Sequence, residues 1–268
     1  MHFKAQQTQC ITCSGQFFMT EQSQIDKKQP FLSHLKELRD RLIVCFIAIA
    51  ITFIFTYIFK ERIFYFLMQP FLKVMPEKSS FIFTYVTEAF ITYFKISLVT
   101  AIFITSPVIL YEMWMFVAPG LYEKEKKFVI PFVFLGSLCF ISGAVFCYFI
   151  ILPVIYKFFV GFAGNIVIPM PDLKGYMNLT LKLLIIFGFI FELPLAVFYL
   201  GKAGIINHRM LSTKRRYAIL GIFILSAIIT PPDISSQILI ALPMWGLYEL
   251  SIIITKFFGK KVPVDERV

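Results

Sequence analysis

Apolar residues gather into six long runs along the chain, and short polar segments separate these runs. Windows of about 20 apolar residues are typical of helices that cross a bilayer. The six runs cover Leu42–Phe59, Ile91–Tyr111, Phe128–Ile151, Leu183–Leu200, Tyr217–Ile229 and Ile238–Ile254. The fifth and sixth are short, so we expect them either to thin the local bilayer or to tilt little and pack against neighbouring helices. The pattern predicts an all-α integral membrane protein with six transmembrane helices, of which the last two are short.

The composition supports the same class. Hydrophobic residues make up 58% of the 268 residues, the mean hydropathy is +0.78, and 33 residues are phenylalanine. A soluble domain of this length could not bury so much apolar surface. The chain is therefore expected to lie in a membrane.

Lysine and arginine residues predict the orientation, because cytoplasmic segments retain positive charge. With both termini inside, the inner segments carry 18 basic residues and the outer segments carry 6. Lys95 and Lys182 lie near the ends of runs, from which their side chains can reach an interface. The net charge of +10 thus reflects topology and contact with anionic lipid. Basic residues scattered over short loops indicate no nucleic-acid partner.

The two ends of the chain differ from the six-helix region at 31–258. Residues 1–30 are polar and lack periodicity, so we predict a disordered extension, with translation from Met19 as an alternative start. Residues 259–268 form a cytoplasmic tail. Cys10 and Cys13 have the spacing of a redox site or half of a zinc site, but no second pair or histidine cluster completes it. We therefore predict no metal and no cofactor.

Prolines interrupt several apolar segments. The segment Ile63–Lys73 is too short to cross the bilayer, and it predicts an interfacial helix that is interrupted near Pro70. Inside a helix bundle, hydroxyl groups and neighbouring helices can satisfy the carbonyls that proline leaves without a donor. The same expectation applies to Pro107, Pro131, Pro153, Pro194 and Pro243.

A carboxylate interrupts the fourth apolar run at Glu192. An ionised acid at the centre of a membrane helix costs about 3 kcal/mol on insertion scales, so such groups face a cavity, a partner or a substrate path. A structural alternative is a hydrogen bond to a neighbouring helix or to an ordered water. A functional alternative is a proton-coupled small-solute transporter that uses Glu192 as the carrier. The chain has no evident internal repeat, which weighs against that transporter.

Two cytoplasmic segments combine apolar and charged residues. Before the first run, one face of a helix would carry Phe31, Leu35, Leu38 and Leu42. Oppositely charged residues one turn apart form the pairs Lys36/Asp40 and Glu37/Arg41. Alone, this segment is typical of an amphipathic helix that lies along the membrane. After the second run, Pro119–Gly120 is a turn signal, and Glu123–Lys127 would begin the next helix.

Taken together, six motifs resemble the TatC family, the multispanning receptor subunit of the twin-arginine protein translocase. In the family's order they are His34-Leu-Lys-Glu-Leu-Arg-Asp-Arg-Leu42, Glu88-Ala-Phe-Ile-Thr-Tyr-Phe-Lys95, Phe116-Val-Ala-Pro-Gly-Leu-Tyr-Glu-Lys-Glu125, Phe191-Glu-Leu-Pro194, Arg215-Arg-Tyr217 and Thr230-Pro-Pro-Asp233. The resemblance extends from about residue 31 to residue 258. It implies a bundle of six helices with a concave face and both termini in the cytoplasm.

The family binds signal peptides of folded proteins, in which two adjacent arginines precede an apolar stretch. The resemblance implies the same activity here, with TatA- and TatB-type single-span subunits as partners, a receptor complex with several copies of the chain, and energy from the proton gradient. No Arg- and Ser-rich, acid-poor transit peptide precedes the first run. We therefore expect a bacterial cytoplasmic (inner) membrane rather than an organelle of bacterial descent.

The motif match also assigns residues to roles. Glu37 and Glu125 would bind the two arginines, because a carboxylate matches the planar guanidinium fork. The adjoining surface would be shaped by Phe116, Pro119, Leu121 and Tyr122, with support from His34 and from Arg39, which would orient the carboxylates or a lipid headgroup. Inside the membrane, Glu192 beside Pro194 would receive a polar group of the peptide or of a TatA-type helix. On the outer side, Asp233 and Gln237 would contact a partner or simply cap a helix.

No enzyme motif is present. The sequence lacks His-Glu-x-x-His, Gly-x-Ser-x-Gly and a phosphate loop, and its three histidines, His2, His34 and His208, are widely separated. We therefore predict a protein without enzymatic activity.

Overall fold

The structure is a computed structural model that describes residues 35–75, 87–117, 129–162, 172–202, 204, 206–230 and 233–258. The predicted extension at 1–30, the Cys10/Cys13 pair and the tail at 259–268 lie outside the described residues.

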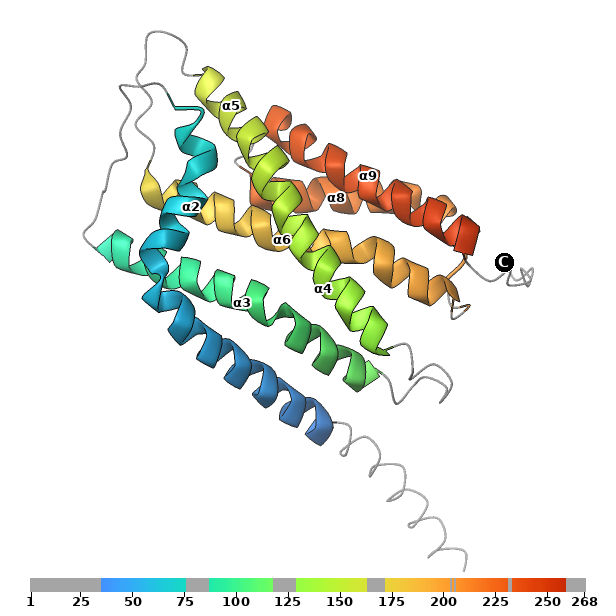
Figure 1. Ribbon diagram of the computed structural model, residues 1–268. Coiled ribbons are helices and arrows are strands. Elements are labelled where there is room, and N and C mark those ends of the chain that lie inside the picture. The colour runs from blue at the N-terminus through green and yellow to red at the C-terminus, as the bar shows by residue number, and fades with distance from the viewer. Residues whose placement is uncertain are drawn as a thin grey trace, which may run out of the picture.

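Helices make up nearly all of the described chain, as the apolar runs predict (Figure 1). Five segments are long and apolar enough to cross a bilayer: the first helix (Leu35–Ile58), α3 (Thr87–Val117), the continuous segment α4 (Val129–Phe146), η3 (Cys147–Ile151) and α5 (Leu152–Phe162), then α6 (Leu173–Lys202) and α9 (Ile234–Phe258). The sixth predicted crossing is α8 (Arg215–Ile229), whose 15 residues rise about 22 Å. Two further helices are α2 (Lys60–Leu72) and α7 (His208–Thr213).

The crossings alternate in direction through the bundle. Figure 1 shows the start of the first helix, the end of α3 and the end of α9 toward one side, with α2 and the start of α6 toward the other. The described ends of the chain therefore lie on the same side, as the charge distribution predicts. The excess of lysine and arginine assigns this side to the cytoplasm.

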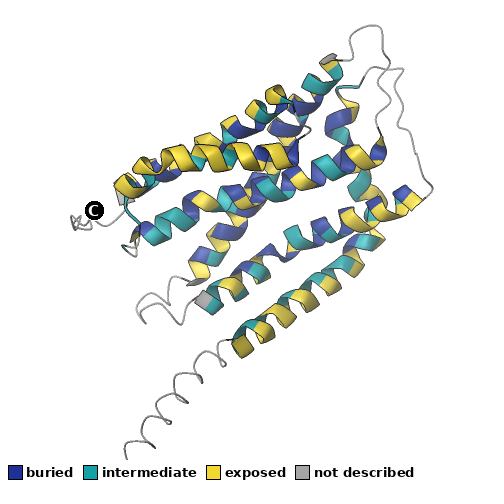
Figure 2. Cartoon of the chain, turned by 180° about the vertical axis from the view of Figure 1, so that it is seen from behind, coloured by how far each residue is buried: buried dark blue, intermediate teal, exposed yellow. Residues whose placement is uncertain are grey.

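The first helix corrects one interpretation of the sequence. A separate amphipathic helix along the membrane is not seen, because the described chain is one continuous helix from Leu35 to Ile58. Other helices bury little of its surface. Only 6% of its apolar window is buried, against 33–39% in the other four long segments, and Figure 2 shows exposed residues along its outer side.

The five long crossings are all longer than the apolar runs predict, and the third and the sixth show two different reasons. The third continues past Ile151 to Phe162, through a π-helical turn at Cys147–Ile151. Pro153 follows this turn and has no N–H for the carbonyl four residues earlier, which explains the wider winding. The sixth is not short: α9 has 25 residues, because its helix also includes polar residues before and after the apolar run.

Hydroxyl groups satisfy two carbonyls that prolines leave without a donor, as the sequence predicts. Pro70 lies inside α2 without ending it, and the freed carbonyl of Phe66 accepts a hydrogen bond from the Tyr148 hydroxyl at 2.7 Å. Pro107 lies inside α3, and the freed carbonyl of Phe103 accepts one from the Ser106 hydroxyl at 2.8 Å. The predicted interruption of α2 near Pro70 is therefore absent, since the helix runs on to Leu72.

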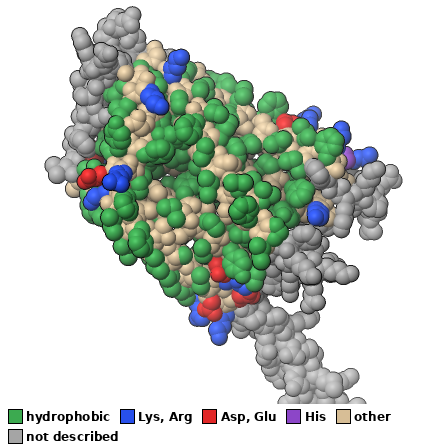
Figure 3. Space-filling model, viewed as in Figure 1, with side chains coloured by type: hydrophobic (Ala, Val, Ile, Leu, Met, Phe, Trp, Pro, Cys, Tyr) green, Lys and Arg blue, Asp and Glu red, His purple; other side chains and the backbone are tan. Residues whose placement is uncertain are grey.

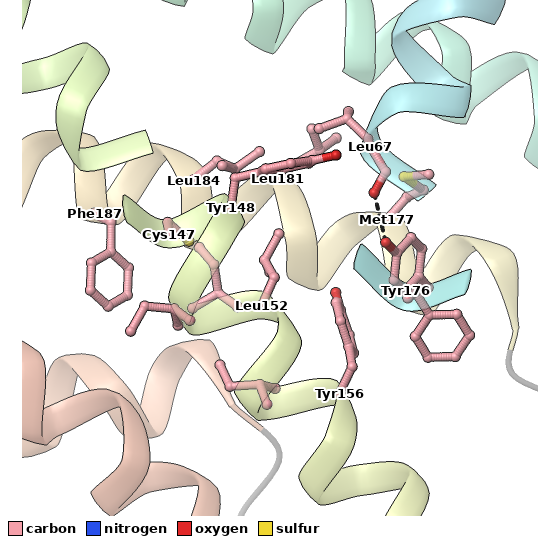
Figure 4. Close-up of a cluster of buried hydrophobic side chains, with 14 of the residues drawn as sticks. Leu67, Cys147, Tyr148, Leu152, Tyr156, Tyr176, Met177, Leu181, Leu184 and Phe187 are labelled. Atoms are coloured by element: carbon pink, nitrogen blue, oxygen red, sulfur yellow. Dashed lines mark hydrogen bonds between the residues drawn. The ribbon is translucent and has the colours of Figure 1, made fainter. Parts of the chain in front are cut away.

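The core lies where α2, η3, α5 and α6 meet (Figure 4). Leu152 and Phe187 are fully buried there. The Tyr176 hydroxyl donates to the carbonyl of Leu67 at 2.8 Å, and the hydroxyls of Tyr156 and Thr180 share a bond of 2.6 Å. These bonds pair the buried hydroxyls: the first joins α6 to α2 at the outer end of the bundle, and the second joins α5 to α6.

Glycines let α4 and α6 approach closely. A Cβ on Gly143 would lie 2.5 Å from the backbone oxygen of Phe187, and one on Gly188 would lie 2.8 Å from the ring of Phe140. Small residues at helix contacts are how membrane helices gain packing energy. This contact fixes the part of α6 that carries the intramembrane carboxylate.

Candidate functional site

Charged side chains meet at the cytoplasmic end, where the first helix lies against α3. The Arg41 guanidinium donates from Nε and Nη2 to Oε1 of Glu37, at 3.0 and 2.6 Å. Its Nη1 donates to Oε2 of Glu112 at 3.0 Å. The predicted Glu37/Arg41 pair is thus confirmed. Because Glu112 belongs to α3, Arg41 also joins two helices.

An open cavity of about 440 Å³ lies at this cluster. Three carboxylates and two cations line it, with one apolar residue: Lys36, Glu37, Asp40, Arg41, Val44 and Glu112. Figure 3 shows positive and negative side chains together at this end of the molecule, whereas the body of the visible face is hydrophobic. A cavity rich in carboxylates at the membrane surface can accept a cation that carries several hydrogen-bond donors.

Arg39 bonds to its neighbour in the chain. Its Nε and Nη2 donate to Oδ1 of Asp40 at 2.9 and 2.7 Å, and both side chains are exposed. Asp40 therefore pairs with Arg39, although the sequence predicted a pair with Lys36. The described arginine that bonds to the Glu37 carboxylate is Arg41.

The end of α3 carries one further predicted site residue. Phe116 lies one turn after Glu112, so the two residues share a side of the helix; Phe116 is half-buried. The remaining members of this predicted surface, Pro119, Leu121, Tyr122 and Glu125, lie outside the described residues, and so does His34. Their part in the site stays a prediction.

An aromatic cluster holds the cytoplasmic ends of three helices together. The ring centroids of Trp114 on α3 and Phe132 on α4 are 3.8 Å apart, and those of Phe132 and Tyr199 on α6 are 4.1 Å apart. Both pairs have edge-to-face geometry, the favoured arrangement for aromatic rings. This cluster fixes the end of α3 and, with it, the position of Glu112.

Glu192 lies at the contact of α3, α4 and α6. A methyl group on Gly136 of α4 would come within 3.4 and 3.5 Å of its two carboxylate oxygens and 3.3 Å from Leu110 of α3. Oε1 of Glu192 is buried without a hydrogen-bond partner among the described residues. Pro194 is buried two residues further along α6 and cannot donate to the carbonyl of Ile190. The described chain thus places Glu192, whose Oε1 has no hydrogen-bond partner among the described residues, two residues before Pro194 on α6.

The outer-side residues have local partners. Oδ2 of Asp233 accepts from the backbone N–H of Ser236 at 2.8 Å, and Oδ1 accepts from its hydroxyl at 2.6 Å. Gln237 Nε2 donates to the carbonyl of Phe223 at 2.8 Å, which joins α9 to α8. These contacts match the helix-cap interpretation of Asp233. Contact with a partner stays a prediction.

A family model, Sec-independent protein translocase protein (TatC), matches residues 33–243. The chain belongs to the TatC family. The TatC of Desulforapulum autotrophicum is 46% identical over 244 residues, which cover 91% of this chain and 90% of that one. The TatC of Escherichia coli K12 is 35% identical over 237 residues, covering 88% and 92%. A crystal structure described as the twin arginine translocase receptor TatC is similar with a TM-score of 0.77 and 41% identity, covering 84% of this chain and 98% of that one.

Membership in the TatC family decides the class of function. The chain is a subunit of a Sec-independent protein translocase, a multi-pass protein of the bacterial inner membrane, and not an enzyme. The solute transporter that Glu192 alone could suggest has no support from this family.

Sequence reasoning missed the link between Glu112 and Arg41. The sequence presents Arg41 only as the helical partner of Glu37, and Glu112 only as the residue that follows the second apolar run. The available signal was a carboxylate at the end of an apolar run, two residues before Trp114. Such a residue sits at the depth where charged groups reach the interface.

Proposed function

We propose that this TatC-family chain is the subunit that binds the twin-arginine signal peptides of folded precursor proteins. It then assembles with TatA- and TatB-type single-span subunits, in a receptor complex with several copies of the chain, for export driven by the proton gradient. The similar protein of known crystal structure is a twin arginine translocase receptor, which supports this assignment.

The observation that carries the proposal is the bonding of Glu37 to a guanidinium. Arg41 places two nitrogens within 3.0 Å of one oxygen of Glu37, beside a cavity large enough for a second side chain. The local geometry therefore suits the group that an arginine-bearing peptide would bring. Lysine offers a compact, strongly hydrated charge that cannot reproduce the planar fork.

The remaining predicted residues complete the proposal. Glu125 would bind the second arginine, and Phe116 with Pro119, Leu121 and Tyr122 would form the apolar surface beside it. Glu192 and Pro194 would receive a polar group of the peptide or of a TatA-type helix. Asp233 and Gln237 would meet the outer end of a partner.

The test uses the full chain in lipid nanodiscs and two peptides that differ only in the two adjacent basic residues, arginines in one and lysines in the other. Each peptide carries a photoreactive group next to twin arginines or twin lysines. We expect the twin-arginine peptide to crosslink near Glu37 and Glu125 and the twin-lysine peptide to give little product. Charge-assisted hydrogen bonds contribute about 1.5–3 kcal/mol each, so Glu37→Gln or Glu125→Gln should weaken binding about tenfold or more.

A matched control is Glu249→Gln, which removes another carboxylate from the same side of the protein. Glu249 bonds to Arg215 at 2.9 Å and lies outside the cavity lining, so peptide capture should not change. Equal labelling by the two peptides would refute arginine recognition at this site.

A further inference from the structure

The guanidinium of Arg41 occupies the carboxylate to which the proposed function assigns a peptide arginine. Two of its nitrogens converge on Oε1 of Glu37, and a third bonds to Oε2 of Glu112. A guanidinium has five donors in a planar fork, so it can bind two carboxylates at once. Arg41 thus presents to Glu37 the chemical group that a signal peptide would also bring.

The two carboxylates differ in access. The side chain of Glu37 is 35% exposed, whereas that of Glu112 is 16% exposed and that of Arg41 is 21% exposed. A ligand that enters the cavity reaches Glu37 more readily than Glu112. Glu112 also bonds to a different nitrogen, Nη1, and can keep this bond when the contacts of Nε and Nη2 are released.

We propose that Arg41 is a resident competitor of the peptide arginine at Glu37, and that Glu112 retains Arg41 when the peptide binds. This inference rests on the proposed function, because it requires that Glu37 receive a peptide arginine. An arriving peptide arginine replaces the bonds between Arg41 and Glu37 with bonds of the same kind, so the free-energy change of this exchange is small. A lysine cannot match the fork that it must displace. Arg41 therefore increases the preference for arginine over lysine.

A different role for Arg41 predicts the opposite sign. If Arg41 served only to hold the first helix against α3, its removal would leave the position of Glu37 less well fixed. Peptide binding would then become weaker. If Arg41 is instead a competitor, its removal takes away the contacts of Nε and Nη2 with Oε1 of Glu37, so peptide binding becomes tighter. The direction of the change in affinity separates the two roles.

The experiment measures the affinity of fluorescent twin-arginine and twin-lysine peptides for the full chain in nanodiscs by anisotropy. We expect Arg41→Gln to bind the twin-arginine peptide roughly tenfold more tightly, with a smaller preference over the twin-lysine peptide. Glu112→Gln removes the carboxylate that retains Arg41, so the affinity should fall roughly tenfold. In the double variant the affinity should return to that of Arg41→Gln.

The matched control is Arg215→Gln, which breaks another inter-helix ion pair, between α8 and α9. It should leave both affinities unchanged. Thermal unfolding shows whether each variant is folded, and Arg41→Lys, a weaker competitor that keeps the charge, replaces Arg41→Gln if that variant does not fold.

Twin-arginine binding that is unchanged or weaker in the Arg41 variant would overturn the competitor role. A double variant that binds as weakly as Glu112→Gln would overturn the role of Glu112. Equal affinity of the unaltered chain for the two peptides would instead refute the proposed function itself.

Discussion

The carboxylates of the cytoplasmic cluster and the carboxylate inside the membrane differ in their hydrogen bonding. At the cytoplasmic end, the carboxylates of Glu37 and Glu112 are both bonded to Arg41 at 3.0 Å or less. Inside the membrane, Oε1 of Glu192 is buried without a partner among the described residues. Near water, a bonded charge can be exchanged for another of the same sign. Inside a membrane protein a buried oxygen without a hydrogen-bond partner is costly, and this cost motivates the proposal that Glu192 receives a polar group.

The surroundings of the two sites differ as well. Glu37 lies on the first helix, of which little is buried, and segments with few buried contacts open at low free energy. Glu192 lies on α6 next to Phe191, whose Cβ would be 2.9 Å from a Cβ on Gly143 of α4, so the two helices meet closely there. The exchangeable site is therefore on a thinly held element, and the unpaired acid is on a rigid one.

The largest effect that this comparison predicts is a loss of stability when the contact between α4 and α6 is disturbed. Gly143→Ala places a methyl group 2.5 Å from a backbone oxygen of α6, which cannot move aside as the end of a side chain could. Overpacking of this kind costs about 3 kcal/mol. We expect a clear fall in the yield of folded protein and in the unfolding temperature measured in detergent.

The control for this prediction is Gly246→Ala on α9, where the added methyl group meets no atom within 4 Å. This variant should be as stable as the unaltered chain or slightly more so, since alanine favours helix over glycine. Equal stability of the two variants would show that the contact of α4 with α6 is not rigid.

The second prediction concerns the unpaired acid. We expect Glu192→Ala to leave the affinity for a twin-arginine peptide within about twofold, because the proposed contacts with the arginines are made at the cytoplasmic cluster and share no partner with Glu192. Transport of a folded precursor into membrane vesicles should fall about tenfold or more, because a polar group that this acid would receive loses its partner.

Glu192→Gln sharpens the comparison, since it retains the shape and hydrogen bonding of the side chain and removes the charge. Recovery of transport in this variant would identify hydrogen bonding as the contribution of Glu192. Transport at the normal rate in Glu192→Ala would remove Glu192 from the proposed mechanism.

The sequence predicted the apolar helices and the placement of both described ends on one side, because apolar length and basic charge can be read locally along the chain. It predicted the Glu37/Arg41 pair for the same reason, since one helical turn separates the two residues. It could not predict the bond between Arg41 and Glu112, because 71 residues separate them and the crossing of two helices brings them together. The length of α9 was also missed, since polar residues continue a helix beyond its apolar run.

The smallest effect is expected at Asp233. This carboxylate bonds only to a nearby residue of α9 in the described chain, so it serves as a reference for the cytoplasmic cluster and for Glu192. It caps α9 through the N–H and hydroxyl of Ser236, so Asp233→Ala should lower the free energy of unfolding by about 1 kcal/mol. Asp233→Asn keeps a capping oxygen and should restore most of that loss in a thermal unfolding experiment. Transport should stay normal in both variants if the cap is its whole function. A transport defect in a stably folded Asp233→Asn would mean that this carboxylate, like Glu192, meets a partner.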